Sequence, residues 1–479
     1  MNTFALDDIQ GNVLRGYRSA NARHFAIQIP EAGDGRGFLA ELLSATEPTV
    51  TPANTWDERP HYCLNVGLTW EGLKALGVAK EILASFPEAF AQGAAARASA
   101  SDPDGIRGVG LGDVGESAPA NWILGGPSTP PVHLMLSLFT DEHRHARRDA
   151  LTKVLREAIV NHGLIEVSVH DAAALPNGTV HFGYRDGISQ PRIAGAPGRQ
   201  LEDMQPEARA GDFLLGGGFV NSYGGNHIGS LPAKLADNAT YAAFRILAQD
   251  CAGFESLLDT WALRWNVDRE SLAATRESLA ATREWLAAKL MGRWRSGAPL
   301  TTNPETAEPA PAESELNRFD YGPSPEHPLF LDDEDGYRCP AGSHIRRLQP
   351  RSGAAAGMAN TRRLIRRGMP YGPPYDPADP ADGVERGLIG LFVCADLELQ
   401  YEFVLRVWAN QDSGAPGLRG TRESIVGAQP DHGGQFLIPV KDARRALVLS
   451  GLPTLTRTRG SVYCMMPGLG GLRYLSTPL

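Results

Sequence analysis

A single acidic residue stands inside a glycine-flanked segment of the 479-residue chain, HFGYRDGISQP at positions 181–191. Asp186 directly precedes Gly187, and Phe182 and Tyr184 are its aromatic neighbours. Glycine lets the backbone approach a large flat ligand closely, and a carboxylate that faces a cavity can act as a general acid or base. A turn aspartate that bonds its own backbone has the same local sequence, so this alternative stays open.

A second segment, CPAGSHIRRLQPR (339–351), places one histidine beside a group of arginines. His344 precedes Arg346, Arg347 and Arg351. Guanidinium groups bind the carboxylates of an organic acid through paired hydrogen bonds, and a neutral imidazole is a common metal ligand. One such histidine with arginines for two propionates is the set of groups that haem requires. A histidine that only satisfies hydrogen bonds within the fold remains the alternative.

A third segment, NTRRLIRRGMPYG (360–372), is rich in arginine. Its four arginines fall too close together for all of them to face one way: Arg362, Arg363, Arg366 and Arg367. A solvated basic turn is one reading of this pattern. The closing apolar turn, GMPYG, is a feature that such a surface does not need.

Strands and helices that alternate along the chain must position these segments. In the first part, residues 132–139 and 164–171 have the apolar pattern of strands, and residues 141–163 between them predict a helix. Earlier strands are predicted at 24–29 and 61–68.

The last part of the chain repeats this alternation. A strand at 387–396 leads into a helix at 397–410, and strands follow near 445–451 and 460–466. The periods are too few for a barrel of alternating strands and helices. We therefore expect an α+β protein built from two domains.

Two stretches in the middle carry little that bears on chemistry. Residues 298–317 are rich in Pro, Glu and Thr and predict a linker or surface loop. Residues 271–284 repeat seven residues verbatim and predict an exposed helix with one narrow apolar stripe.

The composition is that of an ordinary globular protein, with 42% hydrophobic and 21% charged residues. A net charge of −9 gives no reason to expect nucleic acid or a membrane surface as a partner. The start, MNTFALDDIQGN, has no basic region, apolar run or twin arginine, which predicts no signal peptide and a cytoplasmic location. Five widely spaced cysteines without C-x-x-C predict buried thiols, not a disulfide framework or a zinc site.

The three segments together resemble the dye-decolorising peroxidase family. GYRDG fits the family's G-x-x-D-G motif, CPAGSHIRRLQPR is similar to the segment of its proximal haem histidine, and RRLIRRGMPYG is similar to the segment of its distal arginine. The similarity extends over nearly the whole chain, including MGRWRSGAPL and LQYEFVLRVW. Its length and long central insertion resemble the larger members of the family.

The resemblance implies a fold of two ferredoxin-like domains that enclose a haem pocket. We expect an N-terminal domain at 1–195 with the G-x-x-D-G motif, an insertion with the helical repeat and linker at 196–325, and a C-terminal domain at 326–479 with the histidine and distal arginine. The implied activity is reduction of hydrogen peroxide with one-electron oxidation of organic substrates such as dyes, phenolics and other aromatic compounds. The implied cofactor is haem b (iron protoporphyrin IX).

The resemblance also assigns roles to individual residues. It implies Asp186 as the distal acid–base group, His344 as the iron ligand and Arg366 as the charge-stabilising distal arginine. Arg366 is chosen over Arg367 because it stands four residues before Pro370. The residues expected to bind the cofactor are His344, Arg346, Arg351, Gly187 and Arg366.

Several points stay open on the sequence alone. Glu402 is the candidate hydrogen-bond partner of His344, with a surface glutamate as the alternative. Tyr375 and Trp408 are candidates for relaying electrons, with simple packing as the alternative. A haem-binding or haem-delivery protein with little turnover, and an iron-free α+β protein, are the competing functions. The physiological reductant, a homo-oligomeric state and packaging in a larger compartment also stay open.

Overall fold

Strands from both ends of the chain form a single 8-stranded antiparallel sheet with the order β4-β1-β3-β2-β10-β5-β7-β6. The computed structural model describes residues 4–45, 47–99, 110–141, 145–197, 204–223, 231–268, 279–322, 333–351, 362–411, 417–441 and 446–477. The sheet divides into two halves that meet between β2 and β10, where one residue pair, Leu68 and Met465, is in register.

The two halves of the sheet have the same topology. In each half, two β-strand–helix–β-strand units supply four strands. Numbered along the chain, these strands lie in the sheet in the order fourth, first, third, second, which is the ferredoxin-like arrangement. The first half consists of β1 (Asn21–Gln28), α2 (Gly35–Ser44), β2 (Tyr62–Leu68), β3 (Leu134–Thr140), α6 (His145–Asn161) and β4 (Ile165–Ala173). The second consists of β5 (Thr240–Gln249), α8 (Cys251–Asp268), β6 (Ile365–Tyr371), β7 (Gly387–Cys394), the π-helical segments η10 (Leu397–Glu402) and η11 (Val404–Asn410), and β10 (Thr456–Met466).

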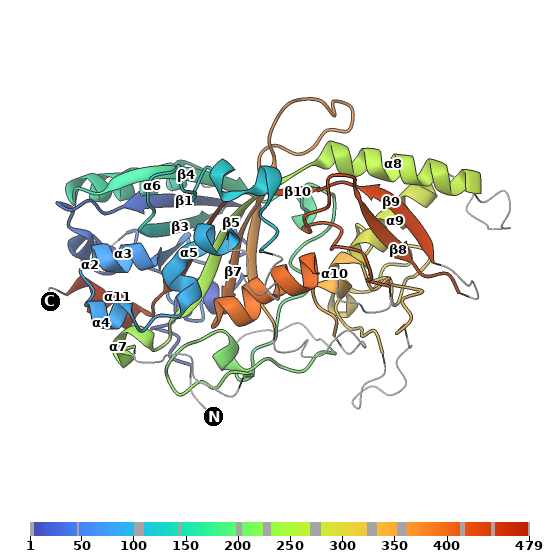
Figure 1. The fold of residues 1–479 in the computed structure, drawn as a ribbon. Coiled ribbons are helices and arrows are strands. Elements are labelled where there is room, and N and C mark those ends of the chain that lie inside the picture. Colours follow the sequence, from blue (N-terminus) through green and yellow to red (C-terminus); the bar gives the residue numbers. More distant parts are fainter. Residues whose placement is uncertain are drawn as a thin grey trace.

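Further helices cover the sheet, and a two-stranded hairpin lies beside it (Figure 1). The helices are α1 (Gly11–Leu14), α3 (Trp70–Ala75), α4 (Lys80–Leu83), α5 (Glu88–Ser99), α7 (Ala233–Ala236), α9 (Leu279–Met291), α10 (His344–Arg347) and α11 (Leu469–Ser476). Short 3-10 turns lie at Gly115–Ser117, Pro119–Asn121, Pro176–Gly178, Ala210–Asp212 and Glu313–Glu315. The hairpin is formed by β8 (Gly434–Ile438) and β9 (Leu447–Leu452).

The apolar core has three parts because both faces of the sheet are covered. One cluster lies on the face shared by the two halves and includes Ala26, Phe244 and Val462. A second cluster packs the helices of the first half against the opposite face. The third lies under α8, α9 and the β8–β9 hairpin, on the right in Figure 1. These elements stand away from the second half of the sheet. The candidate site lies in the space between them and the sheet.

Most of the elements predicted from the sequence are present. All predicted strands are confirmed within a few residues, and the expected α+β class with two ferredoxin-like units is confirmed. The predicted helix at 397–410 is helical, but it winds as π-helix. The division at 195 and 325 stays a prediction, and β5, which lies inside the expected insertion, is a central strand of the sheet.

The helical repeat is only partly within the described residues. Its first copy, at 271–277, lies outside them. The second copy begins α9, where Leu279 is 41% exposed and Leu286 is fully buried. The predicted linker at 298–317 is irregular apart from a single 3-10 turn, but its first residues, including Leu300, are buried in the core under α9.

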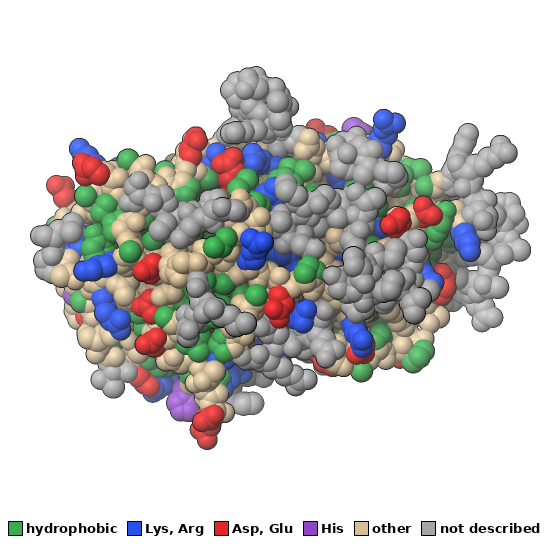
Figure 2. All heavy atoms as spheres, turned by 90° about the horizontal axis from the view of Figure 1, so that it is seen from below, with side chains coloured by type: hydrophobic (Ala, Val, Ile, Leu, Met, Phe, Trp, Pro, Cys, Tyr) green, Lys and Arg blue, Asp and Glu red, His purple; other side chains and the backbone are tan. Residues whose placement is uncertain are grey.

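In the described residues, the cysteines and the surface charges have the character that the composition indicates. All five cysteines are free and buried, as predicted. On the face shown in Figure 2, basic and acidic side chains are interspersed. Within the described ranges, no helix combines the length and apolar character needed to cross a membrane.

A histidine in the shared core makes folding sensitive to pH. His24 on β1 is 5% exposed, its Nδ1 lies 2.9 Å from Ser137 Oγ, and its ring packs edge-on against Phe139 and Phe244. Burial, reinforced by the nearby His170, lowers its pKa to about 3. The unfolded chain therefore binds the proton that the folded protein excludes, so stability falls as pH drops from about 6.5 toward 3.

We predict that His24→Gln removes this pH sensitivity. The variant is expected to be less stable than wild type at neutral pH, because the ring contacts are lost. The difference in unfolding free energy between the variant and wild type should shrink by about 2 kcal/mol between about pH 7.5 and pH 5. Denaturant titration measures this free energy, and the calorimetric midpoints of the two proteins should converge in the same way. His432→Gln, at an exposed position, is the control and should follow wild type. A constant difference between His24→Gln and wild type across this range would contradict the prediction.

Candidate active site

A cavity of about 920 Å³ lies between the second half of the sheet and its roof. This volume is at the upper end of the usual range for small-molecule sites, roughly 300–1,000 Å³. Its walls come from the loop that carries Asp186, from α10, from β5, β6 and β7, and from the π-helical segments. The three sequence-predicted residues Asp186, His344 and Arg366 all line it.

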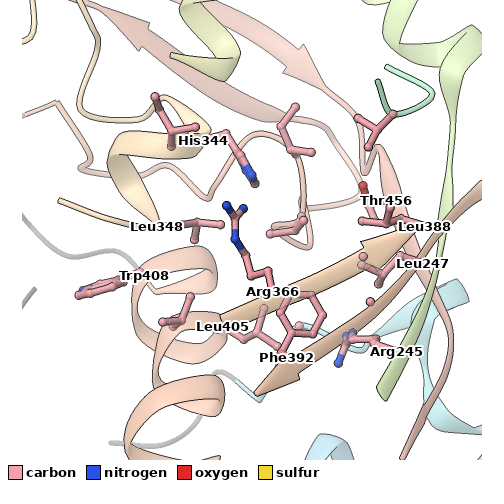
Figure 3. Close-up of a pocket in the computed structure, with 18 of the residues that line it drawn as sticks. Arg245, Leu247, His344, Leu348, Arg366, Leu388, Phe392, Leu405, Trp408 and Thr456 are labelled. Carbon is pink, nitrogen blue, oxygen red and sulfur yellow. The ribbon is translucent and has the colours of Figure 1, made fainter. Parts of the chain in front are cut away.

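A buried carboxylate holds the histidine in the cavity wall. His344 begins α10, and its Nδ1 lies 3.0 Å from Glu423 Oε1. The second oxygen of Glu423 accepts hydrogen bonds from the backbone N–H groups of Ile425 at 3.0 Å and Val426 at 2.6 Å. With Nδ1 bonded in this way, Nε2 is the nitrogen left for a ligand in the cavity. Figure 3 shows the ring directed toward Arg366.

Glu423 is anionic despite its complete burial. Burial opposes ionisation, but the facing His344 ring and the N–H groups of Ile425 and Val426 more than compensate, so the pKa of Glu423 lies below its ordinary value. An anionic acceptor strengthens the hydrogen bond and makes the imidazole a better electron donor at Nε2.

The sequence-based choice of Glu402 as the partner of His344 is wrong. Glu402 is buried, but its carboxylate binds Arg97, with Arg97 Nε 2.9 Å from Oε1, and accepts a hydrogen bond from Tyr463 Oη at 3.1 Å. The winding of η10 turns this side chain toward α5. Glu423, in a loop without periodic pattern, was missed because no sequence signal connects it to a residue 79 positions away.

The arginine opposite the histidine is placed by strand alternation. Arg366 pairs with Phe392 across β6 and β7, and both side chains face the cavity. Arg367 points to the other face, where its Nε donates to the backbone oxygen of Asn12 at 2.7 Å. Of these two neighbouring arginines, Arg366 is therefore the one whose side chain is directed into the cavity beside Phe392.

The loop that carries Asp186 is fastened to the same strand. Arg366 Nη2 donates to Ser189 O at 2.6 Å, and the Gln190 side chain bonds both the N–H and the carbonyl oxygen of Arg366. Asp186 itself is exposed and lines the cavity. Gly183 has φ +82°, and a Cβ there would lie 2.4 Å from Arg295 Nη1, so this turn requires glycine. Gly187 also has a positive φ, +75°, but does not line the cavity.

Two buried arginines give one end of the cavity a positive charge. Arg293 and Arg351 both line it and lie over the ring of Phe319, at 5.1 and 3.7 Å. The hydrogen bonds described for Arg293 go to neutral oxygens, those of Gly297, Leu316 and Asn317. Burial, and then the charge of Arg351, lower the pKa of Arg293 to about 9. This end is therefore suited to an anionic group.

The sequence alone assigns no role to Arg293, which lies within MGRWRSGAPL. By contrast, the predicted cofactor-binding residue Arg346 does not line the cavity. It bonds Asp333 at 3.3 Å and Cys339 O at 2.6 Å, and lies 4.5 Å from the Tyr321 ring centre.

The two aromatic residues considered for electron relay lie in different places. Trp408 lines the cavity beside Leu405 (Figure 3). Tyr375 lies outside it, with Arg386 5.6 Å from the centre of its ring. The geometry brings only Trp408 to the site.

Comparisons with known proteins converge on one family, although no protein-family model matches the chain. The chain is 27% identical over 413 residues to a dye-decolorizing peroxidase of Exidia glandulosa, an alignment that covers 84% of this chain and 74% of the relative. It is 26% identical over 505 residues to the multifunctional dye peroxidase DyP2 of Amycolatopsis, with 98% and 96% covered.

A solved structure adds the fold. The crystal structure of a dye-decolorizing peroxidase variant from Auricularia auricula-judae superposes with a TM-score of 0.79 at 24% identity, over 99% of this chain and 100% of that one. Over most of its length, the chain is similar to dye-decolorizing peroxidases. The arrangement of two ferredoxin-like units is thus shared with the fold of this peroxidase.

The donor set of the cavity fits the haem that these peroxidases require. It offers one imidazole held by an anionic carboxylate, a guanidinium on the facing wall, and buried arginines at one end where propionates need cations. Leu247, Leu388 and Phe392 supply apolar wall for a flat macrocycle.

We predict that Glu423→Gln destabilises the cofactor-free protein by about 1–3 kcal/mol, the cost of weakening a buried charge-assisted network. A neutral amide cannot accept hydrogen bonds from the imidazole and two backbone N–H groups as strongly as the carboxylate. Calorimetry checks the unfolding midpoint, with Glu31→Gln at an exposed position as the control. Equal midpoints for Glu423→Gln and wild type would mean that the network contributes nothing to stability.

Proposed function

We propose that this protein is a haem peroxidase that reduces hydrogen peroxide and oxidises organic substrates in one-electron steps. The observation that carries the proposal is the placement of His344 and Arg366 on facing walls of one large cavity, with Asp186 in the wall beside them. The relatives named dye-decolorizing peroxidases support the same reaction class.

Bound haem b would supply an iron that binds peroxide and accepts the oxidising equivalents when the O–O bond breaks. His344 is the proposed iron ligand through Nε2, and Glu423 keeps the ring in one orientation by accepting from Nδ1. We propose Arg293 and Arg351 as the residues that face the propionates, because both are cationic, buried and in the cavity wall.

Asp186 is proposed to move the proton. Cleavage of hydrogen peroxide requires that a proton leave one oxygen and reach the other, and a single carboxylate can accept it and return it. Arg366 is proposed to stabilise the negative charge that develops on the departing oxygen. Its hydrogen bond to Ser189 O ties the guanidinium to the loop that carries Asp186.

The proposed reductants are dyes, phenolics and other aromatic compounds that each give up one electron. A cytoplasmic location is also proposed, in keeping with five free, buried thiols. A haem-delivery protein is not favoured, because it would have no use for an acid and a guanidinium joined through one loop on the side of the cavity opposite the histidine.

A visible spectrum tests the proposed function directly. Protein produced with haem should show a strong Soret band, and one equivalent of hydrogen peroxide should change it. A chromogenic reductant should then restore the starting spectrum while it is oxidised. Protein that binds haem but gives no spectral change with peroxide would support the delivery protein instead.

We predict that Asp186→Asn retains haem but slows the reaction with peroxide by about 100- to 10,000-fold, because an amide cannot accept the proton. Stopped-flow absorbance in the Soret region measures this rate. Asp379→Asn, at an exposed position away from the cavity, should react like wild type. If Asp186→Asn reacts as fast as its control, the acid–base role is wrong.

A further inference from the structure

The loop that carries Asp186 folds back on itself as a short hairpin. The Asp186 N–H donates to the backbone oxygen of Gly178 at 3.0 Å, and next to this bond Thr179 and Arg185 form an antiparallel bridge. Backbone hydrogen bonds hold the facing residues of a hairpin at a fixed spacing. The position of Asp186 in the cavity wall therefore depends directly on the position of Gly178.

The residue before Gly178 is an asparagine, and Asn177–Gly178 is the only Asn-Gly pair in the sequence. Asparagine is thermolabile because the backbone nitrogen that follows it can attack the side-chain amide. Glycine has no side chain to hinder this approach. The sequence therefore makes Asn177 the asparagine most open to such an attack.

Neither partner in this reaction is protected by the fold. Asn177 and Gly178 are both exposed, and in the part of the chain that the structure describes no group hydrogen-bonds the Asn177 amide. A Cβ added at Gly178 would have no atom within 4 Å, so the space around this residue is open. The Gly178 N–H donates to the backbone oxygen of Leu175 at 3.2 Å, the long limit for such a bond.

The turn is also held in a conformation that few residues adopt. Asn177 has φ 58° and ψ 17°, and Gly178 has φ 66°, so two successive residues are left-handed. Asparagine tolerates this region, but it is less stable there than in the right-handed region. Closure of a ring between the Gly178 nitrogen and Asn177 Cγ requires rotation about ψ of Asn177. Such rotation breaks one long hydrogen bond and leaves a conformation that is already unfavourable, so the fold resists it weakly.

We propose that Asn177 and Gly178 form a site of spontaneous deamidation that acts on the Asp186 hairpin. The Gly178 nitrogen attacks Asn177 Cγ, the side-chain nitrogen leaves as ammonia with the proton of the Gly178 N–H, and a cyclic succinimide forms. Water then adds to either ring carbonyl, and the ring opens to aspartate or isoaspartate at position 177. The reaction needs no oxidant and no cofactor.

The modification disturbs the hairpin. Isoaspartate continues the backbone through the former side chain and lengthens it by one methylene before Gly178. The hydrogen bond from Asp186 to Gly178 O cannot keep its geometry when one side of the hairpin grows, so Asp186 is displaced or loosened. Both products also add a negative charge to the turn. The consequence for peroxide rests on the proposed function of Asp186, because a misplaced carboxylate transfers the proton more slowly.

Mass spectrometry of the full-length, haem-loaded protein tests the modification. After incubation at mildly alkaline pH, the peptide with Asn177 should gain the mass of an amide-to-acid conversion and contain isoaspartate. Mildly acidic pH should give much less, because the attacking nitrogen must lose its proton. Digestion with pepsin in acid prevents conversion during preparation. Asn161, exposed at the end of α6 and followed by His162, is the internal control and should keep its amide.

The same chain in denaturant gives the rate that the sequence alone sets. Conversion of Asn177 in the folded protein should be slower by at most about tenfold, since exposed turns open locally at little cost. A larger protection would mean that the fold shields the site, and the proposal would be overturned.

A variant tests the effect on the hairpin. Asn177→Gln places one more methylene between the backbone and the amide, which makes ring closure much slower. After incubation, wild type and the matched control Asn161→Gln should react with peroxide several-fold more slowly than before, and their backbone amides at 179–186 should exchange hydrogen faster. Asn177→Gln should retain both rates.

Hydrogen exchange decides the coupling even if Asn177→Gln fails to fold. Wild type in which Asn177 has converted, but whose exchange at 179–186 is unchanged, would contradict the link to Asp186.

The outcome is separable from that of the proposed function. A missing Soret band or an absent response to peroxide contradicts the peroxidase, whereas conversion of Asn177 and hydrogen exchange are measured without peroxide. Converted and loosened protein that still reacts with peroxide at its original rate contradicts the role of Asp186 and leaves the modification in place.

Discussion

The hydrogen bond between His344 and Glu423 is the interaction on which the site depends. A carboxylate is rarely buried without compensation, since removal from water penalises its charge. Here the compensation comes from two backbone N–H groups and the imidazole itself. The loop from Glu423 to Val426 must keep its shape for these bonds to exist, so the carboxylate fixes the loop as well as the ring. The Nδ1 atom of the imidazole is therefore occupied by the hydrogen bond to Glu423, and Nε2 is available to a ligand.

The cavity wall opposite His344 depends on a different constraint, the alternation of side chains between the two faces of a strand. Arg366 faces the cavity and Arg367 faces away because they are neighbours on β6. The same period places Phe392 beside Arg366 and a glycine pair beyond it. A shift of one residue in the pairing of β6 with β7 would exchange the two arginines and fill the cavity floor with the wrong side chains. The chemistry therefore depends on register as much as on residue type.

Much of this arrangement could be predicted from the sequence. The three motifs located Asp186, His344 and Arg366, and apolar patterning located the strands that carry or flank them. Two residues of the candidate site could not be predicted from the sequence. Glu423 is joined to His344 only by tertiary contact, and nothing local distinguishes it from Glu402, which the helix turns toward Arg97. Arg293 resembles any surface arginine until burial beside Arg351 is known. The strand β5 was missed because it lies inside the segment, 196–325, that the resemblance to the larger family members assigned to an insertion.

The seam between the two ferredoxin-like units has a mechanical consequence. One residue pair, Leu68 and Met465, joins β2 to β10 in the sheet, whereas neighbouring strands within each unit pair along most of their length. Cohesion across the seam therefore comes mainly from side chains: apolar packing, and the buried Gln10 amide, whose Nε2 donates to Val66 O at 2.8 Å and to Pro467 O at 2.9 Å. The two units are thus coupled along this line by side chains and not by a continuous ladder of backbone hydrogen bonds.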